Sequence, residues 1–159
     1  MLKNIAASIT LSIAFFAIAA ANSFAAAVQP SHASLSAKCN NASERIIKLG
    51  KVQSLCIFGS ISQNNAKWYI DKIDEVDSIF IDSLGGHVIG SMAIGLKIHD
   101  SGKTLYVGTR CFSSCANYIV PASKKIILSD KSIIAFHGTA SSAFHEDYIV
   151  IPSIKFRDI

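Results

Sequence analysis

Charged residues are scarce in this chain, and no dense cluster of one sign occurs. Lysine and arginine together number 15 and aspartate and glutamate 11 in 159 residues, so charged side chains make up 16% of the sequence. Because the lysines are scattered, the chain lacks the basic surface on which nucleic acids bind, and we exclude that class of partner. Internal repeats and low-complexity blocks are absent as well, which excludes a repeat architecture.

The N-terminal segment carries a single charge before a long apolar run. Lys3 precedes the uncharged run Ile5–Ala21. This order, followed by small residues, predicts a secretory signal peptide, and Ser23-Phe24-Ala25 fits the small-x-small rule for cleavage after Ala25. An uncleaved membrane anchor is the alternative, since the run lies near the lower length limit for a span. The small, non-basic residues that follow favour cleavage, so we expect a periplasmic or secreted protein without a stable membrane span.

Three segments follow from this reading: a signal peptide over residues 1–25, a flexible leader over 26–38 and one domain over 39–159. The leader is mostly small or polar and shows no apolar periodicity. The chain that remains after cleavage is long enough for one domain that buries roughly two-thirds of its unfolded surface.

Cysteine is rare, and all four cysteines lie beyond the predicted cleavage site. An oxidising compartment favours disulfides there, and four cysteines allow three pairings. We favour a Cys111–Cys115 bridge, because one helical turn brings two Cα atoms to roughly 6 Å. So short a loop gains little entropy on closure, and such a bridge would shape a turn more than stabilise a fold. The roles of Cys39 and Cys56 stay open.

Apolar patterning predicts strands and helices in alternation. The helices are expected at residues 64–73, 87–100 and 114–120, the last cut short because Pro121 disfavours helix at the residue before it. The strands are expected at 55–58, 78–82, 104–108, 125–128 and 132–138. This order predicts an α/β layered domain.

Three short motifs end predicted strands: DSLGGH (82–87), RCFSSCA (110–116) and FHG (136–138). In an α/β sheet, the ends of neighbouring strands share one edge, and sites are usually built at that edge. We therefore expect the three motifs to lie together.

The residue types in these motifs suit acyl transfer. Ser113, at the first turn of a helix, would attack, and His137 at the end of an apolar strand would be its general base. The pair Gly85-Gly86 leaves backbone N–H groups open to a ligand, so that the amides of Gly86 and Ser114 would hold the oxyanion. Each motif taken alone has a plainer explanation: a glycine turn, a serine N-cap and a structural histidine.

The run Ile81–Gly138 resembles the ClpP-like serine proteases of the ClpP/crotonase fold, and most of all the exported, periplasmic members. The shared features are an S-x-G-G turn (83–86), a C-x-S-x-C serine loop (111–115) and a strand that ends in His137. The resemblance implies a layered fold of ββα units, Ser113 as nucleophile, His137 as base and a peptide or protein substrate. It implies no cofactor and no metal, and it leaves a homo-oligomer open.

The chain departs from the family where the third catalytic residue would lie. The family usually takes its acid from a junction well downstream of the histidine, whereas this chain ends 22 residues after His137. The remaining acids are Glu146, Asp147 and Asp158, which we interpret as solvated charges. The resemblance therefore implies a domain that is short, or truncated, at its C-terminus.

Several alternatives remain at the level of the sequence. A Ser-Lys pair would use Lys124 or Lys125, which we rank below His137 because these lysines begin a strand. Zinc held by Cys111, Cys115 and His137 is disfavoured in an oxidising compartment, and the segment 145–147 (His-Glu-Asp) is a weak metal signal. A catalytically inactive binding or assembly module is the main rival to a hydrolase, and an acyl-CoA enzyme is disfavoured by export.

Overall fold

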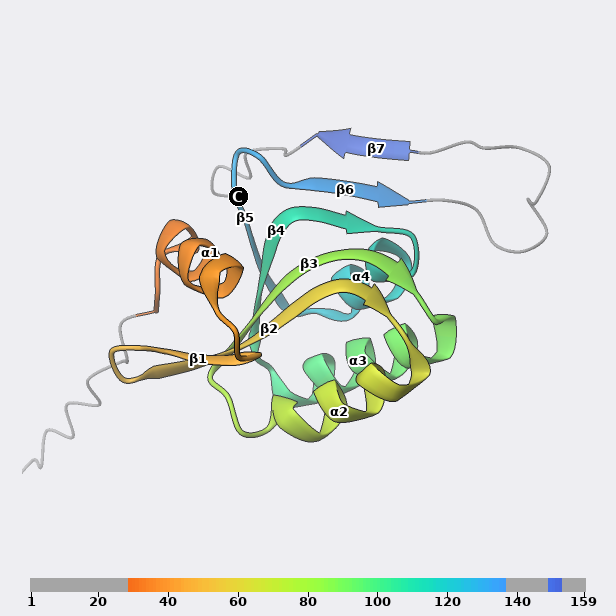
Figure 1. Ribbon diagram of the computed structural model, residues 1–159. Coiled ribbons are helices and arrows are strands. Elements are labelled where there is room, and N and C mark those ends of the chain that lie inside the picture. Colours follow the sequence, from red (N-terminus) through yellow and green to blue (C-terminus); the bar gives the residue numbers. More distant parts are fainter. Residues whose placement is uncertain (1–28, 137–148, 153–159) are drawn as a thin grey trace, which may run out of the picture.

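The computed structural model describes residues 29–136 and 149–152 and places them in one layered α/β arrangement (Figure 1). Seven strands form one sheet. They are β1 (Ile46–Leu49), β2 (Val52–Ile61), β3 (Ser78–Gly86), β4 (Thr104–Phe112), β5 (Lys125–Leu128), β6 (Ile133–Phe136) and β7 (Ile149–Pro152). The helices are α1 (His32–Asn41), α2 (Gln63–Ile73), α3 (Val88–Ser101), the π-helix η1 (Cys115–Ile119) and α4 (Val120–Ala122).

The strand order along the sheet is β1-β2-β3-β4-β6-β7, and parallel strands form its centre. The pairs β2–β3, β3–β4 and β4–β6 are parallel, whereas β1 and β7 pair antiparallel with their neighbours. β5 pairs in parallel with the first half of β4, and β6 pairs with its last residues. The α/β layered fold predicted from the sequence is confirmed.

Two apolar clusters lie on the two faces of the sheet. Helices α2 and α3 lie side by side over one face (Figure 1). The larger cluster joins them to the sheet through Ile57, Ile79, Ile81, Ile94, Ile98 and Leu105, among others. The smaller cluster lies on the opposite face beneath α1, and its buried members are Leu35, Cys39, Ile47, Cys56, Phe80 and Tyr106. Burial also raises the pKa of the Tyr106 phenol, whose hydroxyl donates to the Pro30 carbonyl at 3.1 Å.

Helix α1 corrects one expectation from the sequence. Residues 32–38 belong to this ordered helix rather than to a flexible leader. Ser31 is its N-cap and accepts a hydrogen bond from the Ser34 amide, while Leu35 and Cys39, one turn apart, are fully buried. Leu35 and Cys39 are the only apolar positions of the helix that are buried, so the helix has almost no apolar periodicity that a sequence pattern could detect.

A disulfide between Cys39 and Cys56 fastens α1 to β2, with Cα atoms 5.7 Å apart. We expect the Cys39→Ala/Cys56→Ala double variant to lose about 3 kcal/mol of unfolding free energy, because the bridge closes a loop of 17 residues in the unfolded chain. Urea denaturation of the oxidised proteins measures this loss. An unchanged midpoint would show that α1 is held without the bridge.

The other predicted strands and helices occur in the expected order, with two differences in extent, whereas β1 and β7 lie outside the predicted elements. The central strands are longer than their apolar runs, since β3 continues to Gly86 and β4 to Phe112. The chain also remains helical through Pro121, because η1 is followed by α4 with this proline in its first turn, where no amide donor is required. Within the described part of the chain, no helix has the length and apolar character needed to cross a membrane.

Candidate active site

The serine loop joins β4 to η1 and has an unusual backbone conformation. Ser113 has φ 54°, the only positive φ of a non-glycine residue in the described segments. Its neighbour Ser114 is already in the right-handed helical region and begins η1. A disulfide joins Cys111 to Cys115 with Cα atoms 5.3 Å apart, which confirms the pairing predicted from the spacing. The bridge thus spans the strained residue.

The glycine turn at the end of β3 packs directly on this loop. Gly85 has φ +84°, and a Cβ placed on it would lie 2.5 Å from the Phe112 carbonyl oxygen and 2.9 Å from both Ser113 Cβ and the Ser114 nitrogen. The β3–β4 register continues as far as the pair Ser83 and Cys111. Only a residue without a side chain allows this approach, so the first two predicted motifs do lie together.

Strand β6 ends beside the serine loop, with the first residue of the third motif. Phe112 is paired with Ala135, and the Ser113 amide donates to the Ala135 carbonyl at 2.9 Å. Phe136 ends the strand one residue later. His137 follows it directly but lies outside the described residues, so its role as general base stays a prediction.

The two serines of the loop have different environments. The Ser114 side chain is buried, with 2% of the residue exposed, and its Oγ accepts the Gly86 amide at 2.8 Å. Ser91 Oγ on α3 lies 2.9 Å from the same oxygen. Ser113, by contrast, is partly exposed. The Ser114 hydroxyl is therefore part of a buried network, and Ser113 is the more exposed of the two serines.

Both glycine amides of the expected oxyanion site already have partners. The Gly85 amide donates to Ser83 Oγ at 3.0 Å, and the Gly86 amide donates to Ser114 Oγ. Neither bond could be predicted from the sequence, because each acceptor is a serine hydroxyl whose direction depends on the fold. Ser91 was missed for the same reason: a serine on a helix carries no signal until the helix is placed.

An ion pair lies at the start of the serine motif. The Asp82 carboxylate is buried and accepts the Thr109 amide at 2.8 Å and Arg110 Nε at 3.0 Å. Gly108 lies close enough that a Cβ there would meet Asp82 Oδ2 at 2.9 Å. This carboxylate thereby fixes the segment of β4 that leads into the serine loop.

We expect Asp82→Ala to lower the unfolding free energy by about 2 kcal/mol, because the Thr109 amide loses its charged acceptor in a part-buried hydrogen bond. Half of the Arg110 side chain is exposed, so the loss of its ion pair adds little. Thermal unfolding of Asp82→Ala beside Arg110→Ala separates the two contributions. Equal losses in both variants would contradict this assignment.

The sequence alternatives fare differently. Cys111 and Cys115 form a disulfide, so they are not available as zinc thiolates. Lys124 and Lys125 are exposed, and Lys125 pairs with Thr104 at the end of β4 remote from the serine loop, which argues against a Ser-Lys pair. His145, Glu146, Asp147 and Asp158 lie outside the described residues. Among the described residues, no three His, Cys, Asp or Glu side chains gather as a metal site would require.

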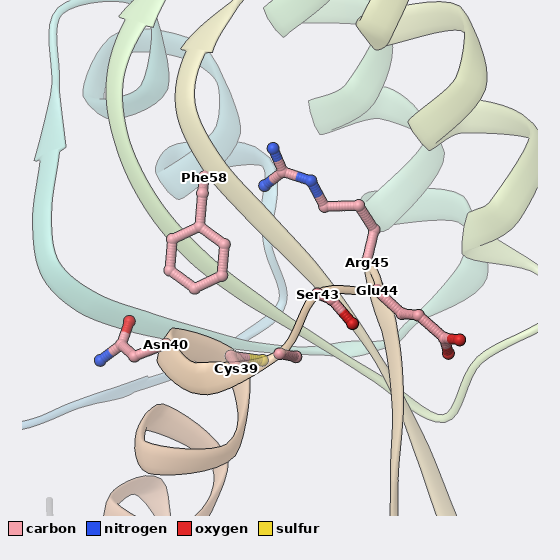
Figure 2. Close-up of a pocket in the computed structure, with 7 residues that line it drawn as sticks. Cys39, Asn40, Ser43, Glu44, Arg45 and Phe58 are labelled. Carbon is pink, nitrogen blue, oxygen red and sulfur yellow. The ribbon is translucent and has the colours of Figure 1, made fainter.

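A shallow pocket lies elsewhere, between the end of α1, the start of β1 and β2 (Figure 2). Its volume is about 270 Å³, and its lining includes Cys39, Asn40, Arg45 and Phe58. The Arg45 guanidinium lies 5.8 Å from the centre of the Phe58 ring. No residue of the serine loop or the glycine turn lines this pocket, so it is separate from the candidate active site.

Comparison with known proteins gives a structural likeness alone. No family model and no curated protein matches the chain. Among solved structures, the chain is similar to the ClpP1 N165D mutant from Listeria monocytogenes, with 22% identity and a TM-score of 0.44. The match covers 55% of this chain and 57% of the ClpP1 chain.

Proposed function

We propose that this protein is an exported ClpP-like serine hydrolase that cleaves peptides, with Ser113 as its nucleophile. The observation that carries the proposal is the positive φ of Ser113, at the point where β4, the glycine turn and β6 meet. Strain of this kind persists only where the surrounding structure enforces it, and it concentrates at functional sites. A sharp strand-to-helix turn also projects a serine hydroxyl out of the sheet toward a substrate.

In the proposed reaction, Ser113 Oγ attacks the carbonyl carbon of a peptide bond while His137 accepts the hydroxyl proton. The C–O bond forms, and the carbonyl π electrons move to oxygen, whose charge the Ser114 and Gly86 amides receive. The C–N bond then breaks, and His137 returns the proton to the leaving amine. Water then attacks the carbonyl carbon of the acyl-Ser113 ester while His137 accepts a proton from it. The bond to Ser113 Oγ breaks, and His137 returns the proton to this oxygen, which regenerates the serine.

Export is supported by two observations. The structure pairs all four cysteines in two disulfides, which persist in oxidising compartments and are rare in the cytoplasm. The N-terminal apolar run after Lys3 has the form of a signal peptide. We therefore place the protein in the periplasm or outside the cell.

One observation favours a second candidate, a non-catalytic binding or assembly module. The amides of Gly85 and Gly86 are both bonded to serine hydroxyls, as they would be in a fold that has no oxyanion to receive. Such a module keeps the serine loop as a structural element. It would not turn over any acyl substrate.

Hydrolysis assays decide between the two candidates. The full chain is expressed with its predicted signal peptide and purified in oxidised form. It is then incubated with activated esters and with a mixture of unstructured peptides. A hydrolase releases product above the level of a Ser113→Ala blank prepared in parallel. Rates equal to the blank for both substrate types would favour the binding module.

A further inference from the structure

We propose that the Ser114 hydroxyl keeps the candidate active site in a resting state by occupying the Gly86 amide. This inference rests on the proposed function, since it concerns the donor that would receive the oxyanion. The Gly86 amide donates to Ser114 Oγ at 2.8 Å. Gly86 itself is exposed, whereas the oxygen that accepts its amide hydrogen belongs to a buried side chain.

Ser91 makes this arrangement stable. Its hydroxyl lies 2.9 Å from Ser114 Oγ, and both side chains are buried, with exposures of 0% for Ser91 and 2% for Ser114. A buried hydroxyl needs hydrogen-bond partners. Ser114 Oγ accepts a hydrogen bond from the Gly86 amide and forms a second one with Ser91 Oγ, in which either hydroxyl can be the donor. α3 and the serine loop therefore both hold the Ser114 side chain toward the Gly86 amide.

The bond between the Gly86 amide and Ser114 Oγ lowers the rate of attack by an amount that follows from the strength of the bond. To receive an oxyanion, the Gly86 amide must first give up its bond to a neutral hydroxyl. The net worth of such a bond corresponds to roughly 2- to 10-fold in an equilibrium, so the resting bond slows attack by a factor of this size. Ser114 is thus a positioning residue that acts through Gly86 and does not touch the substrate with its side chain.

Substitution of Ser114 tests the inference because it should increase the rate. We expect Ser114→Ala to react roughly 2- to 10-fold faster than wild type with a fluorophosphonate, whose phosphoryl oxygen takes the place of the oxyanion. Ser113 Oγ bonds to phosphorus, fluoride leaves, and the hydroxyl proton passes to the base. A purely structural role for Ser114 would leave the rate unchanged or lower it.

Ser78→Ala is the matched control. Ser78 Oγ lies 2.7 Å from Ser54 Oγ in a second buried serine pair, remote from the serine loop. This variant loses a comparable buried hydrogen bond, and we expect it to react at the wild-type rate. Ser91→Ala, which releases Ser114 without removing it, should give a smaller increase.

The outcomes separate the inference from the proposed function. Labelling of wild type at Ser113 with no faster reaction in Ser114→Ala overturns the inference and leaves the hydrolase standing. Absence of labelling in both proteins removes the hydrolase and the inference with it. Amide hydrogen exchange in the wild-type protein needs no variant: the Gly86 amide should be protected, and free exchange in the folded protein would overturn the inference.

Discussion

Ser113→Ala is expected to lower peptide or ester hydrolysis by about 10³-fold or more, while the protein stays folded. The substitution removes one oxygen from a partly exposed side chain and leaves the loop held by the Cys111–Cys115 bridge and by the Ser113 amide bond to Ala135. Alanine and serine pay a similar cost for the positive φ, so the fold should be little affected. Initial rates and thermal unfolding of the same samples measure the two effects separately.

A serine outside the site serves as the control. Ser101 lies in the last turn of α3, where its hydroxyl donates to the Ile98 carbonyl. We expect Ser101→Ala to keep wild-type rates. If Ser113→Ala retains wild-type activity, Ser113 is not the nucleophile, whatever the stability of the variant.

Gly85→Ala is expected to have the second large effect, through the backbone. A Cβ at this position would meet the Phe112 carbonyl at 2.5 Å and Ser113 Cβ at 2.9 Å, and the φ of +84° is itself unfavourable for alanine. Both neighbours are close-packed, so the turn and the serine loop must separate. We expect a loss of about 2 kcal/mol or more in unfolding free energy, together with nearly complete loss of hydrolysis.

Gly102→Ala is the control that separates the cost of a positive φ from the cost of a steric clash. Gly102 ends α3 with φ +64°, and a Cβ there would meet no atom within 4 Å. This variant should lose about 1 kcal/mol of stability with full activity, because it bears the backbone cost alone. Equal activity losses in the two glycine variants would mean that general destabilisation, and not displacement of Ser113, causes the defect.

Much of the site could be predicted because its motifs contain glycine and cysteine residues, which occur in few structural contexts. A glycine pair after an apolar strand and a serine between two cysteines each point to a tight turn, and parallel strands bring such turns to one edge of the sheet. The structure bears out this placement for the glycine turn and the serine loop, which touch at Gly85 and Ser113. The role of His137 as general base stays a prediction, because this residue lies outside the described residues.

What could not be predicted depends on side-chain direction and on long-range packing. The Ser91–Ser114 pair joins residues 23 positions apart, and nothing in either local sequence marks it. Helix α1 has no sequence signature because Leu35 and Cys39 are its only buried residues. The Cys39–Cys56 bridge, whose two cysteines have open roles at the level of the sequence, joins this helix to β2 and becomes evident only once α1 is placed.

The disulfide at the serine loop and the Ser114 contact have opposite consequences for catalysis. The bridge between Cys111 and Cys115 spans the strained turn at Ser113, which in the proposed hydrolase would hold the nucleophile in place before substrate arrives. The bond from the Gly86 amide to Ser114 Oγ, in contrast, would occupy one of the proposed oxyanion donors. The proposed enzyme therefore has a ready nucleophile and an occupied oxyanion donor.

The residue that a fluorophosphonate modifies tests most directly whether Ser113 is a nucleophile. The oxidised protein is treated with the probe and digested, and its peptides are sequenced by mass spectrometry. We predict a phosphonyl adduct on Ser113 and none on Ser114, and no adduct in protein that is heat-denatured before treatment. An unmodified Ser113 in folded protein, under conditions that label a known serine hydrolase to completion, would contradict this prediction.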